Sequence, residues 1–344
     1  HIAAMAPEVV GQRVRREAAR PAAVVDRAQP ADRARRDAGR SSQRTARAAG
    51  GRATAFERDL GNRFVTTVEI VPPRGADPAP MLEAALLLAS RGADAVHVAD
   101  NPSARPAMSG LTAAHLIMRE TDLAAVLHVS CRDRNIVGLQ SDLLGAAALG
   151  IPAIVALTGD PSNVGDFPRA TSVFDVTALG LTKILRTLND GRDHAGADIG
   201  APTRFRIGAA VNPLPRDLDA ECTRLNEKIE AGADFVVTQP VFDPASLRPF
   251  LARTSALGIP VLVGLLPLRS HADAEYFHHE VPGMHVPDDV RERLHRAGDE
   301  AREGIRVARD LLDELSGLAG VAGVYVVSQG RYDAVAEVIG ASRA

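Results

Sequence analysis

Short apolar runs alternate with longer amphipathic segments from residue 61 to the end of the chain. Most of the apolar runs are short and continuous, a pattern typical of strands that are covered on both faces in a parallel sheet. We therefore predict eight strands, at residues 64–71, 95–99, 125–129, 153–157, 206–211, 235–238, 261–265 and 323–327. The amphipathic segments predict helices that include 80–90, 108–120, 139–149, 219–231 and 244–257, and a longest one at 294–315.

Eight strand-then-helix units over about 280 residues match the count and length of a (β/α)8 barrel of the TIM type, an α/β fold. A doubly wound nucleotide-binding fold is the weaker alternative, because no Gly-x-Gly-x-x-Gly follows the first strand. The first 60 residues lack the pattern: they are rich in Ala and contain thirteen Arg against seven Asp and Glu. We expect residues 1–60 to be a helical or linker extension and residues 61–344 to form the barrel.

Composition narrows the classes of function. The net charge of −3 gives no global reason to expect a nucleic-acid partner. The longest uncharged apolar stretch, residues 143–159, is interrupted by Gly and Pro, so we expect no membrane span. Two distant cysteines, Cys131 and Cys222, build neither a disulfide framework nor a cysteine metal site, and we expect no bound metal. Without a signal-peptide pattern, a cytoplasmic protein is expected.

The chemistry of a barrel is assembled where the strands end and the following loops begin. Glu69 lies within the apolar first strand, in the run TVEIVPP at residues 67–73. Burial disfavours the charged form of a carboxyl group, so the pKa of Glu69 should be raised, which suits a general acid. The alternative is a structural ion pair with a neighbouring strand.

Polar residues stand at the ends of other strands. His128 ends the third strand, Gly159 and Asp160 follow the fourth, and Gln239 ends the sixth. The structural alternatives are a hydrogen-bonded core histidine for His128, a helix cap for Asp160 and a cap of the loop backbone for Gln239. No Ser-His-Asp order and no HExxH motif occurs. A glutamate, an aspartate and an amide at the ends of three strands of one barrel suit proton transfer on a heterocycle.

Six motifs in order resemble those of the methylenetetrahydrofolate reductase family. They are VEIVPPR at 68–74, HVSC at 128–131, ALTGD at 156–160, AAVNP at 209–213, KIEAGAD at 228–234 running into TQPVFD at 238–243, and LLP at 265–267. Their order and spacing agree from residue 62 to about 340, which covers the whole barrel.

The resemblance implies an oxidoreductase that uses FAD and NADH or NADPH to reduce 5,10-methylenetetrahydrofolate to 5-methyltetrahydrofolate in a ping-pong reaction. By position, Glu69 matches the acid that protonates N10 of the folate, and Asp160 matches the acidic residue beside the flavin. The matches to substrate contacts are Gln239 and Phe277, and those to FAD contacts are His128, Thr158, Gly159, Asp160, Glu221 and Lys228. Without the resemblance, the sequence favours a solvated helix face for Glu221 and Lys228 and a core contact for Phe277.

Several positions depart from the family pattern. Thr158 stands where many members have Arg, and Val211 where Tyr is frequent, so flavin contacts are expected to differ. These variants resemble the reductase half of bacterial bifunctional proteins, and residues 1–6 resemble the end of an upstream homocysteine methyltransferase domain. A non-redox barrel lyase or aldolase using Glu69 and Asp160, and a folate- or flavin-binding partner module with weak turnover, stay open. So do homo-oligomerisation and the choice of nicotinamide.

Overall fold

The computed structural model describes residues 54–281 and 283–340. Eight parallel strands pair in sequence order, and β8 pairs with β1 to close a barrel. The predicted (β/α)8 fold is therefore confirmed. The strands are β1 (Val65–Ile70), β2 (Ala95–Val98), β3 (Ala124–Ser130), β4 (Ala153–Leu157), β5 (Arg206–Val211), β6 (Phe235–Pro240), β7 (Val261–Leu265) and β8 (Gly323–Val326).

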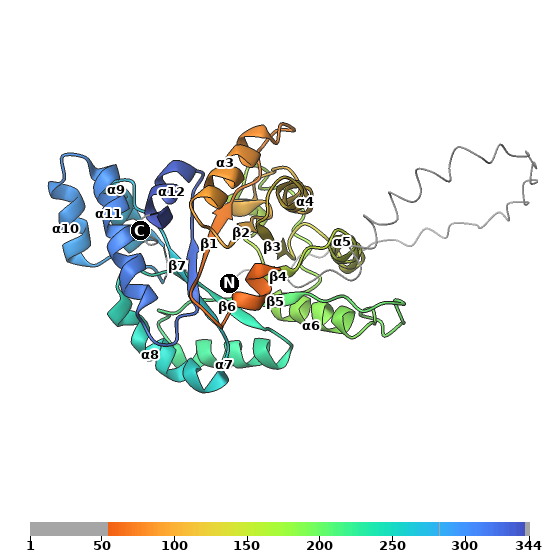
Figure 1. Cartoon of the computed structure of the whole chain (residues 1–344). Helices are drawn as coiled ribbons and strands as arrows, with labels where there is room; N and C mark the ends of the chain where they lie inside the picture. The colour runs from red at the N-terminus through yellow and green to blue at the C-terminus, as the bar shows by residue number, and fades with distance from the viewer. Residues whose placement is uncertain (1–53, 282, 341–344) are drawn as a thin grey trace, which may run out of the picture. The chain divides into compact units, whose positions relative to one another are not determined.

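Helices surround the barrel in the order of the sequence, with the strands at the centre (Figure 1). They are α3 (Ala79–Ser90), α4 (Gly110–Glu120), α5 (Ile136–Ala148), α6 (Ala178–Asn189), α7 (Leu218–Glu230), α8 (Pro244–Thr254), α9 (His271–Glu280), α10 (Asp288–Arg296), α11 (Glu300–Ser316) and α12 (Tyr332–Gly340). The apolar faces of most of these helices share one large core cluster with the outward strand residues, whereas α9 and α10 pack in a separate apolar cluster. Such burial on both faces explains why the strands read as continuous apolar runs.

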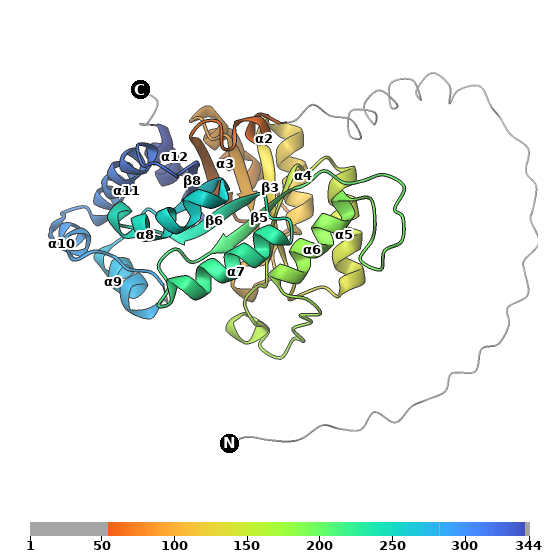
Figure 2. The ribbon, with the colours of Figure 1, turned by 90° about the horizontal axis from the view of Figure 1, so that it is seen from below.

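A short helix, α2 (Ala55–Asp59), closes the N-terminal end of the barrel and lies at the top of Figure 2. Thr54 and Glu57 form a capping box that fixes its first turn. Phe56 is fully buried among residues of the barrel interior, and its ring meets that of Phe235 edge-on at 6.2 Å. The last residues of the expected helical or linker extension are thus a helix, and Phe56 anchors this helix in the barrel.

The prediction of a single helix at 294–315 is wrong, because the structure has two helices in this stretch. The first, α10, ends at Arg296, and α11 begins at Glu300. Asp299 caps α11 by accepting a hydrogen bond from the backbone N–H of Arg302, and Gly298 precedes it. The apolar positions follow one helical spacing across the break although they lie in two clusters, Leu294 with α9 and Leu311 and Leu315 in the main core, and so periodicity alone did not reveal it.

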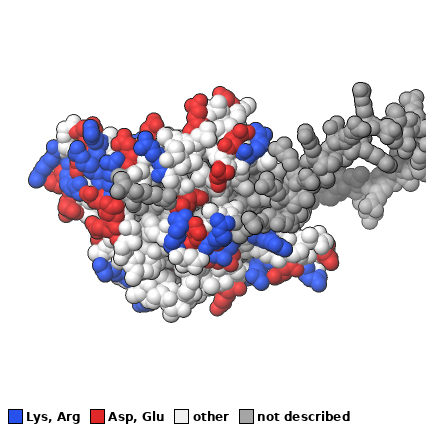
Figure 3. All heavy atoms as spheres, viewed as in Figure 1, with Lys and Arg blue, Asp and Glu red and all other residues white. Residues whose placement is uncertain are grey.

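The two helices carry many charges, which intermix over α10 and α11 in Figure 3. Arg293 pairs with Glu303 at 2.8 Å, and Arg306 pairs with the same carboxylate at 2.8 Å. Charges of both signs therefore neutralise one another locally. No helix in residues 54–281 and 283–340 is long and apolar enough to cross a membrane. The expected methyltransferase-like residues 1–6 lie outside the described part of the chain.

Candidate functional site

A cavity of about 480 Å³ opens at the C-terminal ends of the strands. Its apolar surface comes from small and branched side chains, among them Val155, Leu157, Ala210, Val211 and Val237. Polar groups converge on it from several strands and loops: Glu69, Asp100, Asn101, His128, Arg132, Asp160, Glu221, Gln239 and Tyr325. An apolar wall with a few convergent polar groups is the usual character of a small-molecule site.

Glu69 lines this cavity from β1. Its Oε1 accepts a hydrogen bond of 3.2 Å from the hydroxyl of Tyr325 on β8, and the backbone of Gln329 and Ser328 also bonds to it. Burial raises the pKa of Glu69 above its ordinary value, and these hydrogen bonds only partly oppose the effect. The raised pKa expected from the sequence is confirmed. Within the described residues no cation forms an ion pair with Glu69, which removes the alternative interpretation.

Two histidines and a tyrosine pack together inside the barrel. His97 on β2 is fully buried, and its Nδ1 lies 3.0 Å from Nε2 of His128 on β3. The ring of Tyr325 lies 4.6 Å from that of His97 and 5.9 Å from that of His128. Burial lowers the pKa of His128 to about 4. His128 therefore packs and forms hydrogen bonds as a neutral ring.

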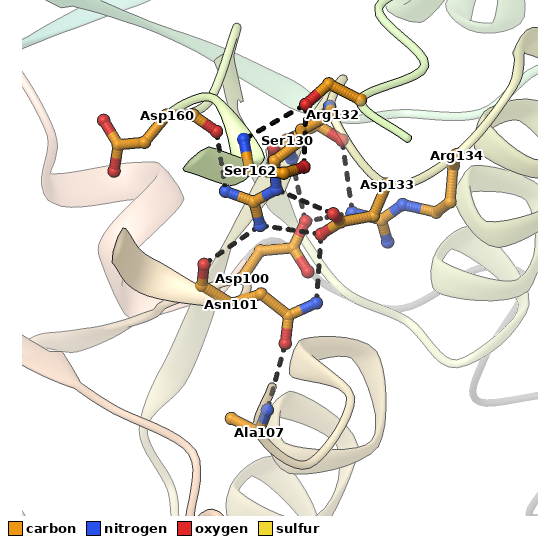
Figure 4. A network of polar contacts seen from close by, with 10 residues as sticks. Asp100, Asn101, Ala107, Ser130, Arg132, Asp133, Arg134, Asp160 and Ser162 are labelled. Atoms are coloured by element: carbon orange, nitrogen blue, oxygen red, sulfur yellow. Dashed lines mark hydrogen bonds and ion pairs between the residues drawn. The ribbon is translucent and has the colours of Figure 1, made fainter. Parts of the chain in front are cut away.

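Asp160 reaches the cavity on the loop that follows β4. The turn depends on Gly159, whose φ of +90° favours glycine and whose added Cβ would lie 2.1 Å from Oγ of Ser130. In Figure 4 the Asp160 carboxylate points away from the guanidinium of Arg132, while its main-chain carbonyl accepts a hydrogen bond of 3.0 Å from that group. The loop is thus held by its backbone, and the Asp160 carboxylate is left at the cavity.

Arg132 ties three strand-end loops together (Figure 4). Its side chain, 3% exposed, donates to the carbonyls of Asn101 and Asp160, each at 3.0 Å. It also makes a two-pronged ion pair with Asp133, with both contacts at 2.7 Å. Such forked geometry fixes both partners. Arg132 therefore orders the loops after β2, β3 and β4 around the cavity.

Gln239 faces the mouth because β6 is irregular. The register between β6 and β7 shifts between Val237 and Pro240, which marks a bulge. Gly264 on β7 makes room for it, since an added Cβ there would lie 2.6 Å from the backbone carbon of Gln239. The exposed Gln239 side chain consequently lines the cavity instead of packing against a neighbour.

Three of the residues expected at the site do not line the cavity. The Thr158 hydroxyl accepts a hydrogen bond of 3.1 Å from the N–H of Ala178 at the start of α6. Lys228 donates to the carbonyl of Ala210 at 2.7 Å. Phe277 is buried in an apolar cluster with Leu266 and Leu268. In this structure these residues have structural partners of their own.

Glu221 does line the cavity, but its carboxylate already has two partners. It accepts a hydrogen bond of 3.0 Å from the N–H of Asn212 and pairs with Arg224 at 2.5 Å. It therefore fastens the β5 loop to α7, and each of its two carboxylate oxygens already has a partner.

The remaining features fit a flat heterocycle such as a flavin ring. Small side chains form the wall, and the backbone turn at Gly159 also lines the cavity. His128, Asp160 and Gln239 supply polar atoms around the rim. Within the described residues no group of three or more His, Cys, Asp or Glu side chains could hold a metal ion.

Sequence reasoning missed His97, Tyr325 and Arg132. Tyr325 is the one aromatic residue in the short strand β8, and Arg132 follows directly on the HVSC motif. Both features were visible as polar groups beside apolar runs, but their partners on other strands were not. His97 gave a similar signal, a single ionisable residue inside the apolar run of β2.

Comparison with known proteins identifies the family of the chain. The sequence matches the family model "Methylenetetrahydrofolate reductase" over residues 56–342. A probable methylenetetrahydrofolate reductase (NADPH) of Caenorhabditis elegans is 26% identical over 72% of this chain and 38% of the relative. The 5,10-methylenetetrahydrofolate reductase of Pectobacterium carotovorum is 27% identical over 64% of this chain and 69% of the relative. Methylenetetrahydrofolate reductase 2 of Schizosaccharomyces pombe is 27% identical, and the match spans 31% of its length.

The solved structure of the coenzyme F420 dependent tetrahydromethanopterin reductase from Methanopyrus kandleri is similar in fold, with a TM-score of 0.50 at 13% identity. That match covers 81% of this chain and 97% of the other. The chain spans about a third of the length of the eukaryotic relatives that it matches. The family match extends over nearly all of the barrel, and the chain therefore belongs to the methylenetetrahydrofolate reductase family.

Proposed function

We propose that the chain reduces 5,10-methylenetetrahydrofolate to 5-methyltetrahydrofolate, with FAD in the strand-end cavity and NADH or NADPH as the hydride donor. Family membership supports the reaction class. The observation that carries the proposal is Glu69, a carboxyl group on the cavity wall whose pKa burial raises. Opening the five-membered ring of the folate requires a proton donor at that wall, and a raised pKa keeps the proton available.

The chain's own residues divide the work. Glu69 holds a proton for N10 of the folate, and the Tyr325 hydroxyl orients its Oε1. The carboxylate of Asp160 places negative charge where the substrate gains positive charge as the ring opens. Gln239 offers an amide, which both donates and accepts, to the edge of the pterin.

FAD, when bound, supplies hydride transfer between the nicotinamide and the folate. His128 and the backbone at Gly159 would hold its ring against the apolar wall of Val155, Ala210 and Val211. Both substrates would enter the same mouth, so they would bind in turn, as a ping-pong scheme requires. The contacts expected of Thr158 and Lys228 would need side chains to leave their present partners.

The test is a spectroscopic one. Purified protein reconstituted with FAD should show flavin absorption that bleaches with NADH or NADPH and returns when 5,10-methylenetetrahydrofolate is added. Failure to bind FAD would favour a non-redox lyase or aldolase. Bleaching without recovery by the folate would favour a binding module with weak turnover.

A matched variant separates the two half-reactions. Glu69→Gln keeps the shape of the side chain and removes its acidic proton. It should retain oxidation of NAD(P)H with an artificial acceptor and lose reduction of the folate, because only the second half-reaction consumes that proton. Equal loss of both would contradict the role of Glu69.

A further inference from the structure

His97 is a buried histidine that the proposed reaction does not use. It points into the barrel from β2 and is 0% exposed. Its Nδ1 lies 3.0 Å from Nε2 of His128, and the two rings meet at 87°. Because Nε2 of His128 is occupied in this way, Nδ1 is the nitrogen that His128 has left for a ligand in the cavity.

Both rings are neutral at physiological pH. Burial lowers the pKa of His97 well below its ordinary value, and it lowers that of His128 to about 4. Each neutral imidazole carries one proton, so one nitrogen of each ring is a donor and the other an acceptor. A single proton lies between the rings, and it fixes the tautomer of both at once.

The surroundings of His97 decide which ring owns that proton. Its Nε2 is buried and has no hydrogen-bond partner among residues 54–281 and 283–340. If His128 donated, His97 would carry its own proton on Nε2, and an N–H would be stranded in the barrel. If His97 donates from Nδ1, only a bare nitrogen is stranded. Buried N–H groups without a partner are rarer than unused acceptors, which favours the second arrangement.

The neighbouring aromatic ring does not reverse this preference. Tyr325 packs on His97 with 45° between the planes, whereas donation of an N–H to a ring face requires a steeper approach. The Tyr325 hydroxyl is engaged by Glu69.

We infer that His97 is a positioning residue: it holds His128 in the tautomer that carries its proton on Nδ1. The cavity then presents an N–H donor at the end of β3, and its ligand must place a hydrogen-bond acceptor there. That acceptor is a carbonyl or ring nitrogen of a heterocycle, or an oxygen of a phosphate group. The identity of the ligand rests on the proposed function, whereas the tautomer does not.

Nitrogen NMR of the histidine rings in the ligand-free protein tests the tautomer directly. The signal of His128 is assigned by its loss in His128→Gln. We expect a neutral ring protonated on Nδ1 between about pH 6 and 8. His97→Asn places an amide nitrogen near the position of Nδ1 and should preserve this state. His97→Leu offers no donor and should return His128 towards the Nε2–H form that free histidine prefers. A His128 ring protonated on Nε2 in the parent protein overturns the inference.

Flavin titration gives the second measurement. His97→Leu should weaken FAD binding about tenfold, which corresponds to about 1.4 kcal/mol, and His97→Asn should recover most of it. Riboflavin should show the same loss if the acceptor belongs to the flavin ring, and no loss if it belongs to a phosphate. Equal weakening by both variants contradicts a positioning role.

The outcomes separate the two proposals. If no variant and no parent protein binds FAD, the proposed function fails while the NMR experiment still decides the tautomer. If His97→Leu does not fold, the parent protein and His97→Asn decide it alone.

Discussion

Replacing Arg132 by methionine removes the guanidinium that joins three loops and keeps most of the volume of the side chain. Four hydrogen bonds are lost, two of them to Asp133 and one each to the carbonyls of Asn101 and Asp160. The Asp133 carboxylate is 35% exposed, so water can replace the guanidinium there. The two carbonyls lose a charged donor in a site where the Arg132 side chain is 3% exposed.

These numbers set the expected loss of stability. Breaking a fully buried ion pair costs about 3–5 kcal/mol, and the exposure of Asp133 moves the estimate to the lower end. A hydrogen bond from a charged donor contributes about 1.5–3 kcal/mol, which gives a similar sum for the two carbonyls. We expect Arg132→Met to lower the free energy of unfolding by about 3 kcal/mol. Arg132→Lys keeps the charge but not the fork, so its loss should be intermediate.

Urea denaturation followed by circular dichroism measures the change, and amide hydrogen exchange locates it. Exchange should accelerate in residues 100–107 and 158–166, the loops that Arg132 joins. Arg119→Met is the matched control, because Arg119 is 55% exposed and, among the residues that the structure describes, forms an ion pair with Glu120 alone, so its loss should stay within about 0.5 kcal/mol. A loss below about 1 kcal/mol for Arg132→Met, with unchanged exchange in both loops, would refute this reasoning.

Three further outcomes are expected. Burial raises the pKa of Glu69, so its contribution to stability is complete below the pKa that it has in the unfolded chain and is lost as the pH rises through its native pKa. Glu69→Gln should therefore be more stable than the parent protein at neutral pH. Urea titrations should show this gain at neutral pH and no gain at low pH. Phe56→Ala should cost about 3–5 kcal/mol of unfolding free energy, since its ring is fully buried against Phe235; a change under about 1 kcal/mol would mean that α2 is not anchored. Gly159→Ala should lower stability and FAD affinity together, whereas Gly196→Ala, at the same φ of +90° but with nothing near its Cβ, should show the backbone cost alone.

The sequence predicted the fold well because the signal was repeated eight times. Three strands, at 153–157, 206–211 and 261–265, have the predicted bounds, and the others differ by a few residues at their ends. Burial on both faces produces continuous apolar runs, so each strand was visible without its neighbours. Glu69 was found for the same reason, as a charge within such a run.

Contacts between strands were beyond the reach of that reasoning. His97 and His128 lie 31 positions apart, and Tyr325 and Glu69 lie 256 apart. Their proximity depends on how each strand is aligned with the next, which composition does not encode. Phe277 and Lys228 show the reverse case: the resemblance supplied a role, whereas in the structure Phe277 packs in an apolar cluster and Lys228 donates to the carbonyl of Ala210.

The irregular pairing of β6 with β7 has a consequence for how this chain could diversify. At most positions of a barrel strand a change of side chain disturbs either the interior or the surrounding helices. Gln239 escapes both constraints, while Gly264 beside it accepts no larger residue. Substitutions at position 239 could thus change which molecules bind at the mouth without disturbing the barrel, provided that position 264 remains glycine.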